Sequence, residues 1–348
     1  MTTATSPAPH ATDQRRTRPV RRSRRRRAVL ALLLTVAVTV PTGIWALSLG
    51  DYPLTFGATT AALVGAGHPG DVLVVRDLHL PRVLAALVSG AGLATSGWLL
   101  QRLAGNALAA PDMLGVNESA AFAVVLALVA GGSDAAVPLM AGIGALTGAA
   151  LLAWLSWRGS LGSGRLVLMG IALHTALAAA TNLFVVSFPV ELAQQTARWT
   201  VGSLYGSDWT TSTVCLVGLG LLGLAAFGSL RRLTVLELGE DTAAGLGLRV
   251  RPARLQLLAL AAALAATGVA LAGPVGFVAL AVPHLARLLG GGAGPLGLGL
   301  TAALGGGIVL GCDLVAQYAL GFALPVGAVT AAVGAPVLLA LLPRWRRR

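Results

Sequence analysis

The chain has 348 residues, of which 56% are hydrophobic and 11% are charged. A water-soluble domain of this size has about 25% charged residues, so this composition excludes a soluble globular protein. The formal net charge of +12 does not indicate nucleic-acid binding, because nine arginines precede Ala28 and four follow Pro343, each cluster beside an apolar run. Basic clusters in such positions are typical of the cytoplasmic flanks of membrane helices.

Residues 1–27 are polar and rich in arginine, and we expect them to be a disordered cytoplasmic tail. Residues 28–348 are predicted to form one all-α, polytopic transmembrane domain of about ten helices, because apolar runs of about 20 residues are long enough to cross a bilayer core. The predicted spans are residues 28–49, 82–101, 114–131, 136–157, 166–189, 210–230, 255–273, 276–289, 295–315 and 325–342.

The arginines between these spans predict the orientation of the chain. If the N-terminus is inside, 22 arginines face the cytoplasm and three, Arg76, Arg82 and Arg198, face outward. Without the two terminal clusters the ratio is still 9 to 3. The positive-inside rule therefore predicts an even number of spans with both termini in the cytoplasm.

The second span and the connector after it carry an informative pattern. Residues 80–115 read LPRVLAALVSGAGLATSGWLLQRLAGNALAAPDMLG, an apolar run that passes into a polar turn. Small residues four apart, such as Gly90 with Ala94, let helix backbones approach closely in lipid. Glu118 follows at the start of the third span, where a helix N-terminus tolerates an anion; a buried proton relay is the alternative.

The longest polar stretch between spans is residues 231–254, RRLTVLELGEDTAAGLGLRVRPAR. The pattern predicts a short amphipathic helix, a glycine turn and a second short helix that enters the next span. Acidic residues favour the N-terminus of the first helix, and Gly245 or Gly247 can end it. A plain connector would explain the charges but would not need a hydrophobic face.

Two further motifs follow near the C-terminus. In GPVGFVALAVPHLAR, residues 273–287, Pro283 interrupts helical hydrogen bonding, and His284 and Arg287 lie one turn apart. No second metal ligand lies at helical spacing from His284, so we interpret it as a structural hydrogen-bonding residue rather than a metal ligand. Residues 324–336 read LPVGAVTAAVGAP.

These motifs, in this order over residues 72–346, resemble the FecCD-type permeases, which are the membrane subunits of vitamin B12 and iron-siderophore ABC importers. The resemblance implies a type II ABC importer permease in the plasma membrane of a bacterium, which is not itself an enzyme and holds no cofactor. The motif residues to which it gives a structural role are Gln101, Asn106, Pro111, Asp112, Gly115, Pro283, His284, Arg287, Pro325, Gly327, Gly334 and Pro336.

The resemblance also implies partners. The sequence contains no lysine, so it cannot hold a Walker A motif, and ATP must be hydrolysed on other chains. We therefore expect two ABC ATPase subunits, a second permease copy or paralogue, and an extracytoplasmic substrate-binding protein that docks on Arg76 and Arg82. The residues expected to contact the ATPase are Leu238, Gly239, Glu240, Asp241, Ala244, Leu246 and Gly247.

The chain departs from the family pattern at its outer face. His79 and Gln317 stand where relatives have arginine, and Ala323 stands where they have glutamate. Relatives use those arginines to hold glutamates of the binding protein. Docking here is therefore expected to rely less on positive charge from this chain, unless a partner permease supplies it.

The family carries ferric chelates, cobalamin or haem, and we predict a ferric siderophore, with cobalamin and haem as alternatives. Thr181, Asn182 and Ser187 in the fifth span are predicted to line the path.

An ion-coupled secondary transporter is a second hypothesis, since such proteins place ionisable residues within the membrane. Its candidate residues would be Glu118, His174 and Asp313. An intramembrane enzyme is a third hypothesis, but neither an HExxH nor a GxSxG motif is present.

Overall fold

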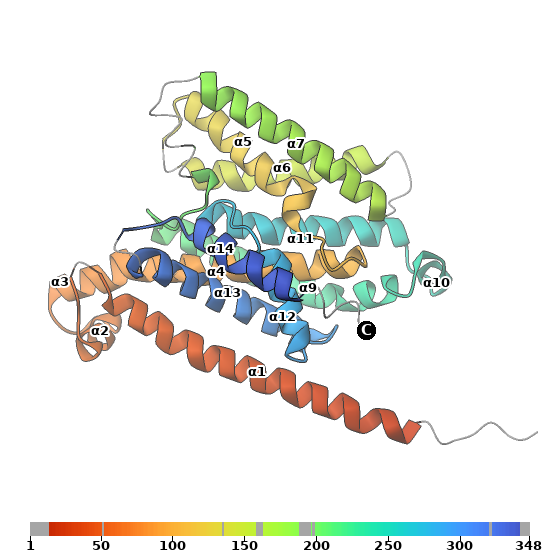
Figure 1. The fold of residues 1–348 in the computed structure, drawn as a ribbon, viewed down its shortest axis with the longest axis horizontal. Coiled ribbons are helices and arrows are strands. Elements are labelled where there is room, and N and C mark those ends of the chain that lie inside the picture. The colour runs from red at the N-terminus through yellow and green to blue at the C-terminus, as the bar shows by residue number, and fades with distance from the viewer. Residues whose placement is uncertain are drawn as a thin grey trace, which may run out of the picture.

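The computed structural model describes residues 14–50, 52–133, 136–157, 163–187, 196, 199–319 and 322–341, and every regular element within these ranges is a helix. The long helices lie side by side along one direction (Figure 1). The elements are α1 Gln14–Ser48, α2 Phe56–Leu63, α3 Pro69–Val72, η1 Leu73–His79, α4 Leu80–Leu103, η2 Pro111–Leu114, α5 Val116–Val129, α6 Val137–Trp157, α7 Ser163–Ser187, α9 Trp209–Leu236, α10 Glu240–Gly245, α11 Val250–Ala272, α12 Val278–Leu288, α13 Pro295–Tyr318 and α14 Val326–Leu341.

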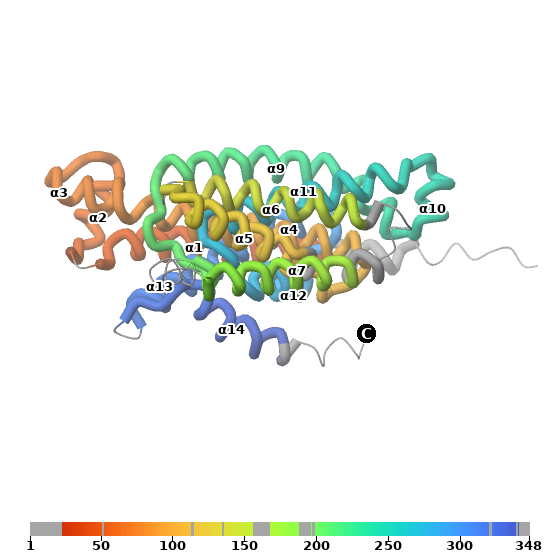
Figure 2. Tube along the Cα trace, turned by 90° about the horizontal axis from the view of Figure 1, so that it is seen from above, coloured from red at the N-terminus to blue at the C-terminus, as the bar shows by residue number. Residues whose placement is uncertain are grey.

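The helices account for all ten predicted spans. Among the described residues, seven helices are long and apolar enough to cross a membrane, and three shorter apolar helices accompany them. Each of these helices overlaps one predicted span. The short helices α2 and α3 lie at one end of the bundle and α10 lies at the other, which we call the α3 end and the α10 end (Figure 1, Figure 2).

The N-terminal tail differs from the disorder expected of it. Helix α1 begins at Gln14, so residues 14–27 continue the first apolar helix without a break. Arginine is a good helix former, and a helix already nucleated by the apolar span extends readily through such residues. Residues 1–13 lie outside the described part of the chain.

Helix α4 is the centre of the bundle. It packs against α13, α11, α12 and α9, and in Figure 1 it lies between the α5–α7 layer and α1. In the continuous helix Pro69–Leu103, most of which is α4, 83% of the most apolar stretch is buried inside the protein. The corresponding share is 17% in α7 and 11% in α1. The peripheral helices therefore expose their apolar side chains, whereas α4 is enclosed by protein.

Glycines make this enclosure possible. A Cβ placed on Gly90 would lie 2.2 Å from the carbonyl oxygen of Gly305 on α13, and one on Gly97 would lie 1.8 Å from that of Ala279 on α12. Any larger residue would force these backbones apart. The small-residue spacing in the sequence thus corresponds to helix-to-helix contact.

Helix α12 is short and buried rather than a full span. It has 11 residues, about 16 Å of helix, which is roughly half of a bilayer core. It follows Phe277, the one described non-glycine residue with a positive φ, 66°. Gly334 of α14 leaves room for this side chain, because a Cβ on Gly334 would lie 2.4 Å from Cβ of Phe277.

We predict that Gly97→Ala destabilises the protein by about 1–3 kcal/mol, the range for overpacking a tight contact. The matched control is Gly223→Ala on α9, where nothing lies within 4 Å of the added methyl group. Thermal unfolding in detergent should show a lower midpoint for the first variant and an equal or slightly higher one for the second. Equal midpoints would contradict the close contact of α4 with α12.

Candidate functional site

Gln101, in the last turn of α4, joins motifs that are far apart in the sequence. Its side-chain Nε2 donates hydrogen bonds to the carbonyl oxygens of Ala279 and Leu280, at 3.3 and 3.1 Å. Its Oε1 accepts from Nη1 of Arg287 at 2.8 Å, and Nη2 of Arg287 lies 3.3 Å from Nδ1 of His284. With only 3% of Gln101 exposed, this buried network fixes α12 to the end of α4.

The other residues of the connector shape its turn. The Oδ1 of Asn106 accepts from the backbone N–H of Leu108 at 2.9 Å, and Pro111 begins η2. Gly115 has φ 73°, and a Cβ there would lie 3.1 Å from the side chain of Leu173 on α7. A glycine is therefore required where the connector bends past α7.

Four polar side chains meet where η2, α5 and α7 come together. Asn117 donates a hydrogen bond from Nδ2 to Oδ1 of Asp112, and Oε1 of Glu118 lies 3.5 Å from Nδ1 of His174. Burial raises the pKa of Asp112 to about 6, and the charge of Glu118 acts in the same direction, while His174 and Asn117 act against them. Two of the ionisable residues singled out in the sequence, Glu118 in the first turn of α5 and His174 in the middle of α7, are thus neighbours.

Residues 231–254, which the family resemblance predicts to contact the ATPase and which we call the coupling segment, lie at the α10 end. Gly239 and Gly247 bracket α10 with φ of 99° and 80°, conformations that favour glycine. Glu240 forms an ion pair with Arg254 of α11. All seven residues expected to contact an ATPase are exposed, including Leu238 at 59% and Leu246 at 64%, whereas Ala243 is buried. Two apolar side chains beside acidic groups form a surface suited to a protein partner.

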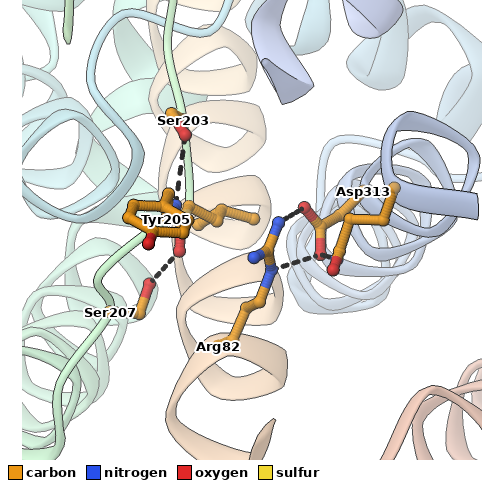
Figure 3. Close-up of polar contacts among 7 residues, drawn as sticks. Arg82, Ser203, Tyr205, Ser207 and Asp313 are labelled. Atoms are coloured by element: carbon orange, nitrogen blue, oxygen red, sulfur yellow. Dashed lines mark hydrogen bonds and ion pairs between the residues drawn. The ribbon is translucent and has the colours of Figure 1, made fainter. Parts of the chain in front are cut away.

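At the α3 end, Arg82 binds another helix of the same chain. Its Nε and Nη2 contact Oδ2 and Oδ1 of Asp313 on α13 at 3.0 and 2.9 Å, as Figure 3 shows. Gln317 Nε2 donates to the same carboxylate at 2.7 Å. The side chain of Arg82 is 24% exposed and that of Asp313 is 5% exposed.

The second predicted docking residue, Arg76, lies exposed at the same end. Its backbone oxygen accepts a hydrogen bond from Nε1 of Trp209 at 2.8 Å. In the view of Arg82 in Figure 3, the backbone N–H of Tyr205 donates a hydrogen bond to Oγ of Ser203, and 88% of Tyr205 is exposed. This end therefore presents an exposed aromatic ring as well as charge.

The three predicted path residues do not share one face of α7. Thr181 is 6% exposed, and its hydroxyl has no hydrogen-bond partner among the described residues. Asn182 and Ser187 are exposed. Because a helix turns by about 100° per residue, adjacent positions 181 and 182 must point in different directions.

The sequence interpretation missed several residues that the structure brings together. The partner of Arg82 is 231 residues away along the chain, and Glu237, although inside the coupling segment, contacts Arg102 from α4. Neither spacing follows a helix repeat. The one feature of the sequence that pointed to the contact of Arg82 with Asp313 was Gln317, which stands four residues after Asp313 where relatives have arginine.

A bundle of this kind, with seven membrane-length apolar helices among the described residues, defines a multi-pass membrane protein. Comparison with known proteins specifies it further. Residues 32–344 match the family model of the FecCD transport family, and the chain belongs to that family. It is therefore a permease subunit of an ABC transporter and not an enzyme.

Curated relatives match over nearly the whole chain. The ferric enterobactin permease FepG of Escherichia coli (strain K12) is 37% identical over 325 residues, 93% of this chain and 98% of that protein. The probable siderophore permease YfhA of Bacillus subtilis (strain 168) is 33% identical, covering 92% and 96%. A solved putative metal-chelate type ABC transporter in an inward-facing conformation has TM-score 0.81 and 30% identity, covering 90% and 98%.

We predict that Arg82→Met lowers stability by roughly 2–3 kcal/mol, because it leaves the Asp313 carboxylate buried without its main partner. The double variant Arg82→Met/Asp313→Leu should recover most of that loss, since it removes both charges. Thermal unfolding in detergent measures both effects. If the double variant is as unstable as the single one, the ion pair is not what Arg82 contributes.

We predict that stability depends on the pH through Asp112. Its pKa is about 6 in the folded protein, against an ordinary value of 3.8 that applies to the unfolded chain. The stabilisation from the protonated carboxyl is therefore complete below pH 4 and is lost as the pH rises through 6. A shift of one pKa unit corresponds to ~1.4 kcal/mol, so the free energy of unfolding falls by at most about 3 kcal/mol.

The measurement is the unfolding midpoint at pH 5 and pH 8. Asp112→Asn should raise the midpoint at pH 8 and reduce the difference between the two pH values. Asp241→Asn, at an exposed site in the coupling segment, should leave that difference as it is in the wild type. An unchanged pH dependence in Asp112→Asn would contradict the assignment.

Proposed function

We propose that this chain is the permease of an ATP-driven importer that carries a ferric siderophore. The observation that carries the proposal is the match to the ferric enterobactin permease, 37% identical and almost complete in both chains. Permeases named for achromobactin in Dickeya dadantii (strain 3937) and for iron(3+)-hydroxamate in Bacillus subtilis (strain 168) are 37% and 32% identical. These names favour an iron chelate over cobalamin or haem.

The working unit contains two ATPase subunits beneath two permeases, with a substrate-binding protein on the other side. The exposed leucines and acids of the coupling segment support the ATPase contact. Two observations support a permease pair made of related chains. FepG and FepD of Escherichia coli carry the same system name and match this chain at 37% and 36% identity. The chain also covers only 41% of the hydroxamate permease FhuB, a length that leaves room for a second unit.

The α10 end faces the cytoplasm in this proposal, together with both termini. Helix α1 begins at that end (Figure 1), and its basic residues precede the apolar run. The α3 end then faces outward and receives the binding protein. Because Arg82 is engaged with Asp313, Arg76 is the arginine that remains exposed for docking among the described residues at this end.

The positions of the two carboxylates do not favour a secondary transporter. Glu118 is in the first turn of α5, and Asp313 pairs with Arg82 near the α3 end, whereas His174, the neighbour of Glu118, is halfway along α7. Ion-coupled transporters place such groups near the middle of the bilayer. Among the described residues, no group of three His, Cys, Asp or Glu side chains could hold a metal ion.

The test is uptake of iron-55 siderophores by vesicles that contain the permeases and their ATPase. We expect uptake of a ferric siderophore only with ATP and the binding protein, and no uptake of labelled cobalamin. Uptake of cobalamin instead would show that the proposed substrate is wrong, but it would still support an ATP-driven importer. Uptake without any ATPase would contradict the importer itself.

A further inference from the structure

We infer that Arg102 is the positioning residue through which movement of the coupling segment reaches the central helix α4. The inference rests on the proposed function, since it concerns how the ATPase acts on this permease. It assigns the task to one side chain in the last turn of α4, next to Gln101. The alternative is that the coupling segment acts on the bundle through apolar packing alone.

Arg102 holds Glu237 with both arms of its guanidinium. The Nε lies 2.6 Å from Oε1 and the Nη2 lies 2.8 Å from Oε2. Two parallel charge-assisted hydrogen bonds of this kind fix direction as well as distance. The Nη1 donates to the carbonyl oxygen of Ala293, in the loop between α12 and α13, at 2.6 Å. One side chain therefore connects three segments of the chain.

The guanidinium is held in place from one face as well. Its Cζ lies 4.5 Å from the centre of the Trp98 ring, one turn earlier on α4, and Trp98 is 1% exposed. Stacking of this kind restrains an arginine over an aromatic face. The side chain of Arg102 is itself only 9% exposed, against 32% for Glu237. Arg102 is thus a rigid part of α4 rather than a solvated surface arginine.

Glu237 lies where such a connection is needed. It is the C-cap residue of α9, and Gly239 then turns the chain into α10. Helix α10 packs against α9 and α11. When the coupling segment moves, the ion pair of Glu237 with Arg102 therefore moves α4 with it. The next ion pair, Glu240 with Arg254, joins α10 to the beginning of α11.

The neighbouring residue extends the connection to α12. Gln101 binds the first turn of α12 and also Arg287 near its end. Movement of α4 along its axis would therefore take α12 and the Ala293 loop with it. Helices α4 and α12 are enclosed within the bundle, so their displacement alters its interior, which movement of an outer helix would not.

The test uses the complete importer in vesicles, with uptake of a ferric siderophore and ATP hydrolysis measured on the same sample. For Arg102→Met and Glu237→Gln we expect hydrolysis near the wild-type rate and a drop of about tenfold in cargo moved per ATP, within the usual range of coupling between sites. Arg102→Lys should also be impaired, because an ammonium group cannot hold both carboxylate oxygens and a carbonyl in the same plane. The matched control is Arg231→Met, an exposed arginine of the same segment.

The charge exchange Arg102→Glu/Glu237→Arg should recover part of the amount of siderophore moved per ATP hydrolysed. A general loss of structure caused by each substitution would not be recovered in this way. A wild-type ratio in Arg102→Met would overturn the inference. Loss of the ATPase from purified Arg102→Met would overturn it too, because the residue would then serve assembly. Absence of uptake by the wild type contradicts the proposed function instead.

If the wild type takes up no siderophore, a measurement that needs no transported substrate still tests the inference. Leu289→Cys, in the exposed start of the Ala293 loop, reports on movement there by its rate of maleimide labelling with and without ATP. The two native cysteines are buried, so their background is low. We expect the ATP-dependent change in rate to disappear in Arg102→Met and to remain in Arg231→Met. An unchanged response in Arg102→Met would overturn the inference.

Discussion

The structure depends on the direct backbone contact of α4 with the helices around it. In lipid no hydrophobic force drives helices together, so association depends on close packing and on polar contacts between helices. Glycines at positions 90 and 97 permit that approach, because no side chain separates α4 from α13 and α12. Helix α4 is consequently enclosed in protein, while α1, α7 and α9 expose apolar surface.

The charge-assisted contacts of the enclosed helix α4 lie at its two ends. At the α10 end, Gln101 and Arg102 bind α12 and the coupling segment side by side. At the α3 end, Arg82 binds Asp313 of α13. The charged and amide side chains of α4 are thus at its two ends, and its middle has apolar residues together with the buried hydroxyl residues Ser89, Thr95 and Ser96. This division suits a permease, which performs no chemistry and changes shape when a separate ATPase acts on it.

The departures from the family pattern have a physical explanation at the α3 end. Gln317 binds the carboxylate of Asp313, which also holds Arg82. An arginine that satisfies a buried carboxylate is less available to a partner protein, so docking must use other groups at this end. The exposed Tyr205 ring and Arg76 are two of the exposed groups that the described residues offer there.

The sequence by itself determined the class of protein and the ten apolar helices, because the length of an apolar run and the order of the motifs are local properties of the chain. It failed for residues 14–27, where a helix continues into a segment whose composition suggested disorder. Only the tertiary structure decided that Arg82 faces Asp313 and that Arg102 faces Glu237, since these partners are 231 and 135 residues apart and meet only when the helices pack. No periodicity connects such pairs, because their distance depends on how whole helices cross.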